Sequence, residues 1–397
     1  MRFSRIYRAK HQPFAWLLIW RHKYKSLAGV LGIAFTSLLI IFQLGFYDSL
    51  VESSSGIIKS LNAELMLVHA DNVTVINLSS FPESRLSSLD YIPGVEETVP
   101  LRWTYAKWKL SGQRQTRLAV ILGIEPISKS LVGVDFDERS EDAILIPETI
   151  LFDRTCRSEF GRVEKLLSKK SHVTGFINNR RVNIDGLVDI GPSFGYDCIL
   201  VSSQQTYEAV IGNDHHPANP NQIEVGLIRV SPGYTVEQVA RTIRERIQPD
   251  VQVLTKKDLV EFEKDYWLRS KPIGYVFGFG ITMGFVIGTI ILYQILYADI
   301  IANLEHYAVM LAIGYPMVYL RQVVASQALI MVALSYPLTI AAAAIGYRYL
   351  GVFTNLPFVL SLDKVVGTFG LVMAMSVLST ILALSHLNST NPVDAFK

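Results

Sequence analysis

The stretch that decides the fold is GYVFGFGITMGFVIGTIILYQILYADIIANLEHYAVMLAIGYP, residues 274–316. Its first part, Gly274–Ala298, has no charged residue and is long enough to cross a hydrocarbon core about 30 Å thick. Its second part, Asp299–Pro316, is short, more polar and helical in pattern. A spanning helix followed at once by a short amphipathic helix predicts a membrane protein with a structured connection between two spans.

Four uncharged stretches are long enough to span a bilayer, and they cover residues 26–47, 272–298, 322–347 and 365–393. The chain is 50% hydrophobic and 18% charged, and its mean hydropathy is +0.30. These values fit a combination of membrane spans and a water-soluble domain. Any one stretch could be a buried core helix, but four of this length in one chain favour transmembrane helices.

Basic residues at the amino terminus predict the orientation. The first 25 residues carry seven Lys or Arg and no Asp or Glu, so the amino terminus is expected in the cytoplasm. Four spans then place the carboxy terminus there too. No cleavable signal peptide is expected, because the first apolar run is too long and no small-residue cleavage site follows it. Residues 13–25 instead predict an interfacial helix that contacts membrane lipids.

The predicted fold class is an α+β membrane protein. Four transmembrane helices carry one large mixed α/β extracytoplasmic domain, inserted between the first and second helices on helical stalks. The predicted segments are a cytoplasmic amphipathic segment (1–25), the first transmembrane helix and stalk (26–61), the extracytoplasmic domain (62–255), a stalk and the second transmembrane helix (256–298), a short cytoplasmic helix (299–316), the third transmembrane helix (317–348), a short extracytoplasmic loop (349–364), the fourth transmembrane helix (365–388) and a cytoplasmic tail (389–397).

Within the extracytoplasmic domain, residues 107–123 predict a β-hairpin that turns at 111–113. Residues 223–255 read as a strand, a helix and a strand, which indicates a small α/β subdomain. Cys156 and Cys198 both lie in this domain. An oxidising compartment would allow a disulfide between them, but two unpaired thiols fit the sequence equally well.

Several motifs suggest chemistry that the rest of the sequence does not support. LSGQRQ, residues 110–115, resembles the signature of ABC ATPases, yet the chain has no G-x-x-x-x-G-K-[ST] loop to hold phosphates. His215 and His216 beside Asp214 lack further ligands at metal-binding spacing. Cys156 with His172 lacks a group to orient the base. We therefore expect neither an enzyme nor a bound cofactor or metal.

Glycine residues mark a packing surface in the second span. Gly280, Gly284 and Gly288 recur every four residues, so that another helix can approach the backbone closely. The partner helix could be the first span of the same chain or belong to a second copy. No span holds an ionisable residue in its middle, which disfavours an ion-coupled transporter or a hydrophilic pore.

The short helix expected over 299–314 has apolar residues at three- and four-residue spacing, and Gly314 can end it before Pro316. Asn303, Glu305 and His306 give it a polar side. Such a helix could dock into a groove of a soluble partner. An ordinary interfacial loop remains the alternative on this chemistry alone.

Three stretches carry a family resemblance. NLEHYAVMLAIGYP, residues 303–316, resembles the coupling segment of MacB/FtsX-type ABC permeases, and the predicted topology is similar to theirs. Residues 15–50 and the closing NPVDAFK, residues 391–397, resemble the DevC-type subunits of this group, which are cyanobacterial. The resemblance covers essentially the whole chain, and it lies in the order and spacing of the motifs.

The resemblance implies a non-catalytic permease subunit in the inner membrane that works as a homodimer, without nucleic acid. A separate ABC ATPase, which holds the ATP and Mg²⁺, would move it mechanically. Its extracytoplasmic domain would meet a periplasmic membrane-fusion adaptor that joins a TolC-like outer-membrane channel, for export of a glycolipid or another envelope substrate. Alternatives are an FtsX-like regulator of a cell-wall hydrolase and a lipoprotein-release permease. A membrane-anchored sensor is disfavoured, because the chain lacks a cytoplasmic signalling domain.

The resemblance also implies which residues dock to the ATPase. These are Leu304, Glu305, His306, Tyr307, Ala308, Leu311 and Gly314. Two of them depart from the family pattern, since the family has an acidic residue at the place of His306 and often a basic one at the place of Leu311. The groove of the partner ATPase is therefore expected to differ, or the pairing to be looser.

Overall fold

The computed structural model describes residues 23–75, 77–124, 126–136, 138–169, 172–191, 193–212, 221–270 and 272–389. Most of the expected interfacial helix over 13–25, the loop with His215 and His216, and nearly all of the tail over 389–397 lie outside the described residues. The chain divides into two compact units. We call them the helical unit (residues 23–48, 273–353 and 358–389 among those described) and the sheet unit (49–272 and 354–357).

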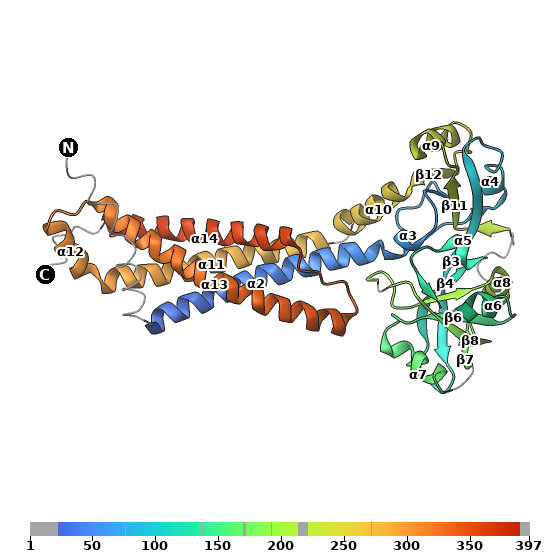
Figure 1. Cartoon of the computed structure of the whole chain (residues 1–397), viewed down its shortest axis with the longest axis horizontal. Helices are drawn as coiled ribbons and strands as arrows, with labels where there is room; N and C mark the ends of the chain where they lie inside the picture. The colour runs from blue at the N-terminus through green and yellow to red at the C-terminus, as the bar shows by residue number, and fades with distance from the viewer. Residues whose placement is uncertain are drawn as a thin grey trace. The chain divides into compact units, whose positions relative to one another are not determined.

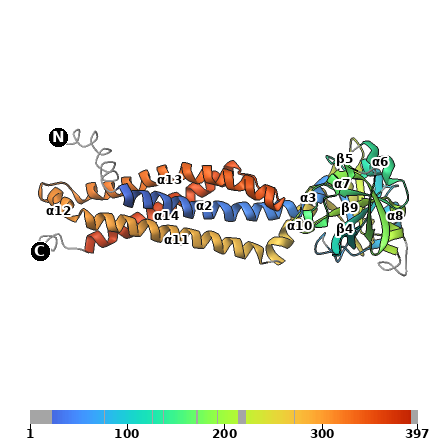
Figure 2. The ribbon, with the colours of Figure 1, turned by 90° about the horizontal axis from the view of Figure 1, so that it is seen from below.

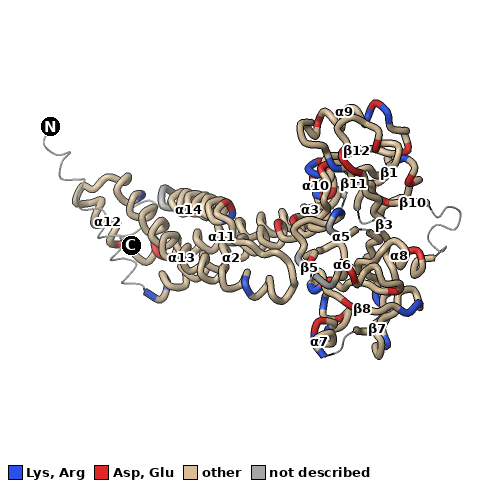
Figure 3. The backbone as a smooth tube through the Cα atoms, turned by 45° about the vertical axis from the view of Figure 1, so that its right-hand side comes forward, with Lys and Arg blue, Asp and Glu red and all other residues tan. Residues whose placement is uncertain are grey.

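Four helices of the described chain are long and apolar enough to cross a membrane. They are α2 (Lys23–Ser54), α11 (Ile273–Ala302), α13 (Met317–Thr354) and α14 (Leu362–Ser389). They run side by side in the helical unit (Figures 1 and 2). In Figure 3 they carry few blue or red segments, whereas charged residues are frequent along the sheet unit. The predicted fold class is therefore confirmed: four apolar helices, with an α/β domain between the first and second.

Helix ends differ from the predicted bounds. Helix α13 continues six residues beyond Arg348 to Thr354, and α14 begins at Leu362, so the loop predicted over 349–364 is shorter. A charged residue at the end of a span does not stop a helix, because a long basic side chain can reach the polar interface. Asn355, with φ of 55°, ends α13 instead. The stalk predicted over 48–61 is also interrupted, since α2 ends at Ser54 and α3 (Gly56–Ser60) follows as a separate turn.

The glycine stripe packs inside the helical unit. A Cβ atom added at Gly280 would lie 2.7 Å from Gln43 of α2, and one at Gly284 would lie 2.9 Å from Ile40. A Cβ atom added at Gly288 would lie 2.6 Å from Met375 of α14. These distances are shorter than real Cβ contacts. The stripe therefore lets α11 approach α2 and α14 of the same chain, which is one of the two partners that the sequence allowed.

The sheet unit is built on a ten-stranded sheet in the order β12-β1-β11-β3-β4-β9-β6-β8-β5, with β7 pairing β3 and β8 (Figure 1). The strands are β1 (Leu65–His69), β3 (Val95–Leu110), β4 (Arg117–Gly123), β5 (Asp135–Phe136), β6 (Thr149–Asp153), β7 (Val173–Ile177), β8 (Arg180–Asp189), β9 (Ile199–Ser202), β11 (Val225–Val230) and β12 (Val251–Thr255). A separate pair joins β2 (Phe81–Pro82) to β10 (Gln222–Ile223).

Short helices cover the sheet. They are α4 (Ser84–Ser87), α5 (Ile127–Ser130), α6 (Glu138–Ile144), α7 (Val163–Leu167), α8 (Gln204–Ile211), α9 (Val236–Arg244) and α10 (Lys256–Asp265), with a π-helical turn over Tyr266–Ser270 directly after α10. The long strand β3 serves two parts of the sheet, because its first half pairs with β11 and its second half with β4 and β7.

Both local predictions for this unit agree with the structure. Strands β3 and β4 form the expected antiparallel hairpin, and Gly112 in its turn has φ of 87°. Residues 223–255 form β11, α9 and β12, and Thr235 and Gln238 make a capping box at the start of α9. The sequence did not reveal that β1 lies between β11 and β12 and pairs antiparallel with both.

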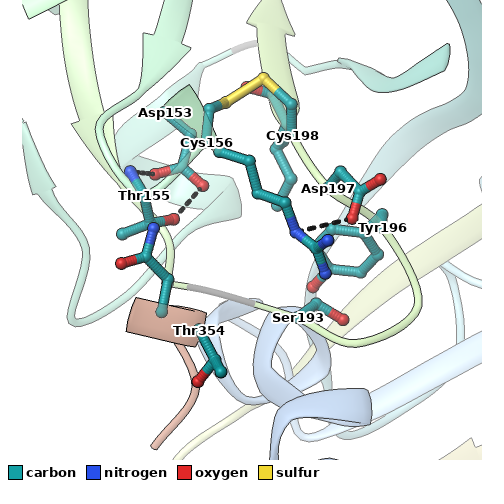
Figure 4. Close-up of a pocket in the computed structure, with 12 residues that line it drawn as sticks. Asp153, Thr155, Cys156, Ser193, Tyr196, Asp197, Cys198 and Thr354 are labelled. Atoms are coloured by element: carbon teal, nitrogen blue, oxygen red, sulfur yellow. Dashed lines mark hydrogen bonds and ion pairs between the residues drawn. A yellow bond between two sulfur atoms is a disulfide. The ribbon is translucent and has the colours of Figure 1, made fainter. Parts of the chain in front are cut away.

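The structure joins Cys156 and Cys198 by a disulfide with a Cα–Cα distance of 4.3 Å. The bond connects the segment after β6 with the residue before β9, and these two strands are antiparallel neighbours. Figure 4 shows it beside a small pocket that also contains the ion pair between Arg157 and Asp197. The disulfide makes Cys156 unsuitable as a nucleophile, in agreement with the sequence.

Asp153 in this pocket gives a prediction for pH dependence. Its side chain is buried and accepts hydrogen bonds from the amide and hydroxyl of Thr155 at 3.0 and 2.8 Å. Burial, only partly offset by these bonds, raises the pKa of Asp153 from 3.8 to about 6. The stability that this proton contributes is present below pH 3.8 and is lost as the pH rises through about 6.

We therefore expect Asp153→Asn to raise the free energy of unfolding of the sheet unit at pH 8, by at most about 3 kcal/mol, and to change it little at pH 4. Thermal unfolding followed by tryptophan fluorescence at both pH values would test this. Asp197→Asn, at a half-exposed position in the same pocket, is the control. A gain for Asp153→Asn that is equal at both pH values would contradict the prediction.

Candidate functional site

A nine-residue helix, α12 (Leu304–Ala312), connects α11 to α13. Asn303 separates it from α11, because its φ of −112° and ψ of 13° interrupt the helical backbone. At the other end, the amide of Gly314 donates to the carbonyl of Leu311 and the amide of Tyr315 donates to that of Met310, each at 3.0 Å. This pair of bonds, with Gly314 at φ of 102°, is a Schellman motif that ends the helix firmly.

One face of α12 packs against the core of the helical unit. Tyr307 and Ala308 are buried, and Leu304 and Leu311 are half-buried against that core. These four residues are among those that the family resemblance implied for docking. The structure places them toward the helical bundle, so their contacts hold α12 in position. A bulky residue at Ala308 would consequently disturb the bundle itself.

The opposite face of α12 is exposed. Glu305 and His306 lie on it, as do Val309, which is 50% exposed, and Ile313 beyond the helix end, which is 73% exposed. We call these four residues the outer face. Glu305, Val309 and Ile313 follow one another at four-residue intervals, the spacing that places side chains above one another on a helix. The exposed Gly314 follows directly after the outer face.

Sequence reasoning found Glu305 and His306 but missed Val309 and Ile313. The available signal was their four-residue spacing from Glu305, which sets them on a stripe different from that of Leu304 and Ala308. Such a stripe of two aliphatic side chains beside a carboxylate and an imidazole offers an apolar contact area flanked by polar groups. This composition suits a protein–protein contact.

A buried polar network holds the junction between α11 and α12. The side-chain amide of Gln327 in α13 donates to Asp299 Oδ2 at 2.8 Å. The side-chain amide of Asn303 donates to the backbone carbonyl of Asp299 at 2.8 Å and to its Oδ1 at 3.3 Å. Gln327 and Asn303 are almost completely buried. Burial, with the Asp299 carboxylate as a second cause, also raises the pKa of Tyr307.

This network ties three helices together at one point. Asp299 lies near the end of α11, Asn303 lies at the break before α12, and Gln327 lies in the third turn of α13. Two of the three bonds are accepted by the Asp299 carboxylate at a partly buried position, and a hydrogen bond to a charged group is stronger than a neutral one at the surface. A force on α12 would therefore reach both adjoining helices through these side chains as well as through the backbone.

The described residues contain no group of three His, Cys, Asp or Glu side chains that could hold a metal ion. Helix α12 has one face packed against the core of the helical unit and the opposite face exposed. Four helices of spanning length with an inserted α/β domain define a polytopic membrane protein.

Comparison with known families identifies the bundle more closely. Residues 278–392 match the family described as FtsX-like permease C-terminal. These residues therefore form an FtsX-like permease domain, and α12 lies within it. No curated protein matches the sequence at a significant level.

Three solved structures are similar to part of the chain. The periplasmic region of MacB from Actinobacillus actinomycetemcomitans is 11% identical, with a TM-score of 0.36 over 51% of this chain and 94% of that one. The extracellular domain of the ABC-type transporter YknZ from Gram-positive bacteria is 14% identical, with a TM-score of 0.33 over 49% and 99%. A domain of a putative permease from Porphyromonas gingivalis is 17% identical, with a TM-score of 0.32 over 48% and 89%.

Proposed function

We propose that this chain is the permease subunit of an ABC exporter and transmits mechanical work from a separate ATPase to the sheet unit. The observation that carries the proposal is the outer face of α12. It is presented to solvent on a helix whose inner face and junction with α11 are held by the bundle and whose end is closed by its own backbone hydrogen bonds. A partner that moves this face moves α11 and α13 with it.

The orientation follows from the same proposal. The basic amino-terminal segment and the four apolar helices support an arrangement in which both chain ends and α12 face the cytoplasm, where an ATPase holds its ATP and Mg²⁺. The sheet unit is then extracytoplasmic. The disulfide between Cys156 and Cys198 supports this location, because disulfides persist in oxidising compartments. The permease itself catalyses no reaction and holds no cofactor.

The apolar interior of the bundle supports mechanical transmission in place of passage through the membrane. None of the spans has an ionisable residue in its middle, so a polar substrate would find no hydrated or charged path. In the DevC-type arrangement that the sequence resembles, a homodimer in a cyanobacterial inner membrane would work on a periplasmic adaptor joined to a TolC-like channel. Its cargo would be a glycolipid or another envelope molecule.

A regulator of a cell-wall hydrolase and a lipoprotein-release permease share the same mechanical part. They differ from the exporter only in the extracytoplasmic partner, which would be a hydrolase or a lipoprotein in place of an adaptor. Cross-linking of the sheet unit in intact cells, followed by identification of the attached protein by mass spectrometry, distinguishes the three.

Substitution on the outer face tests the proposal. We expect Ile313→Asp, alone or with Glu305→Lys, to reduce recovery of an ABC ATPase with the affinity-tagged chain at least tenfold. The ATPase would be identified by peptides from its phosphate-binding loop. An aspartate at the contact must be buried unpaired when the partner docks, whereas Ile313 is exposed in the free chain and the fold is unaffected.

The matched control is Val359→Asp, which places the same charge at a 62% exposed aliphatic position in the connection between α13 and α14. This variant should retain the ATPase. Equal recovery of the ATPase with Ile313→Asp and with the unmodified chain would show that the outer face is not the docking surface.

A further inference from the structure

A groove of about 890 Å³ lies in the sheet unit, and none of the residues that the proposed function uses lines it. It is bounded by α9, by the start of α10 and by the segment 61–64 that leads into β1. Its volume falls within the range of about 300–1,000 Å³ that small-molecule sites occupy. The groove is lined by both charged and aliphatic side chains.

Four cationic side chains line the groove, two from α9 and two from α10. Two of them already have structural partners. Arg244 donates to the backbone carbonyl of Val253 at 3.3 and 3.4 Å, and Lys256 Nζ donates to the carbonyl of Leu61 at 2.7 Å. The other two, Arg241 and Lys257, are exposed, and their side chains have no hydrogen bond or ion pair with the described part of the chain.

None of the three acidic side chains of the groove forms a hydrogen bond or an ion pair with Arg241 or Lys257 in the described part of the chain. Glu64 accepts a hydrogen bond from the amide of Val230 at 3.0 Å. Asp258 accepts one from the amide of Thr255 at 3.4 Å, as part of the capping box of α10. Glu237 lies in the first turn of α9, where the helix dipole favours a negative charge. The donors left without a partner in the groove are therefore the guanidinium of Arg241 and the ammonium of Lys257.

Aliphatic side chains form the rest of the lining. Val132 is 50% exposed, Val236 is half-buried, and Leu61 and Ala240 are buried beneath them. A guanidinium and an ammonium recognise a carboxylate or a phosphate, the guanidinium with two parallel hydrogen bonds. An apolar lining next to them gains free energy when it covers hydrocarbon. Both features together select a ligand that has an anionic head and an apolar body.

We propose that this groove binds an acidic amphiphile, with its carboxylate or phosphate at Arg241 and Lys257 and its hydrocarbon against Val132 and Val236. The acidic amphiphile is also the proposed class of cargo for the exporter, and in this respect the inference rests on the proposed function. The binding itself requires no ATPase, so the groove and the outer face of α12 can be tested and can fail separately.

Isothermal titration of the full chain in a neutral maltoside detergent tests the proposal. The probe is a short-chain phosphatidic acid with two six-carbon acyl chains, and the comparison ligands are the matching diacylglycerol and inorganic phosphate. We expect the phosphatidic acid to bind at least tenfold more tightly than either. The double variant Arg241→Gln/Lys257→Gln should weaken its binding at least tenfold, and this loss should shrink as salt is added.

The control is Arg246→Gln, which removes an exposed cation just beyond α9 that does not line the groove. It should leave the affinity unchanged. Three results would overturn the proposal: equal affinity in the double variant, equal affinity for the uncharged diacylglycerol, and inorganic phosphate binding as tightly as the phosphatidic acid. The last result would indicate a site for a free anion that makes no use of the aliphatic lining.

Discussion

Simultaneous replacement of Cys156 and Cys198 by serine is expected to lower the free energy of unfolding of the sheet unit by about 4 kcal/mol. The two cysteines are 42 residues apart, and a cross-link over that distance removes about this much chain entropy from the unfolded state. Both side chains are also buried in a core with Trp108 and Phe160, so each serine would bury a hydroxyl in an apolar site.

Urea unfolding of the full chain in detergent, followed by tryptophan fluorescence, measures this effect. Trp103, Trp108 and Trp267 all belong to the sheet unit, and Trp108 packs in the same core as the disulfide. A reducing agent should destabilise the unmodified chain by a similar amount and leave the serine variant unchanged. A loss below about 1 kcal/mol, or equal sensitivity of both proteins to the reducing agent, would contradict the prediction.

The sequence was sufficient to predict the helices that span the membrane, because a run of about 20 uncharged residues has few other stable conformations. It was insufficient to predict the residues at which these helices end. Arg348 interrupts the uncharged run, yet α13 continues to Thr354, since a backbone in helical conformation tolerates a charge that can reach water. Asn355 adopts a positive φ and ends the helix at that point. A hydropathy pattern contains no information about this backbone conformation.

The candidate site shows the same division between local and long-range information. Asn303, Gly314 and Pro316 define where α12 begins and ends, and each acts on the backbone next to it. Which side of α12 faces the bundle is not local information. The helix has aliphatic residues on two stripes, and only its packing shows that Ala308 lies inside while Val309 lies outside.

Sequence patterns did not predict any contact between residues that are distant along the chain. The pairing of β1 with both β11 and β12 joins residues more than 150 positions apart. The disulfide required a Cα–Cα distance, which the structure gives as 4.3 Å. Nothing in the sequence pattern singles out Gln327, because its hydrogen bond to Asp299 depends on the register between α13 and α11.

That hydrogen bond gives the second large prediction. We expect Gln327→Leu to lower the free energy of unfolding of the helical unit by about 2–3 kcal/mol, because it removes the hydrogen bond to Asp299 Oδ2 and places an apolar side chain beside a partly buried carboxylate. The matched control is Gln322→Leu, the same substitution at an exposed position of the same helix, which should have little effect. Thermal unfolding in detergent measures both variants.

A double-mutant cycle with Asp299→Asn separates the bond from general effects of each substitution. The coupling energy between the two positions should be about 1.5–3 kcal/mol, the range for a hydrogen bond to a charged group. Additive effects, or equal losses for Gln327→Leu and Gln322→Leu, would show that the pair does not hold α12.

If the pair does hold α12, a purified complex of Gln327→Leu with its ATPase should still assemble through the outer face and yet lose the coupling of ATP hydrolysis to export. This outcome is expected because the proposed mechanism assigns docking to Val309 and Ile313 and transmission to α13 to the Asp299–Gln327 contact.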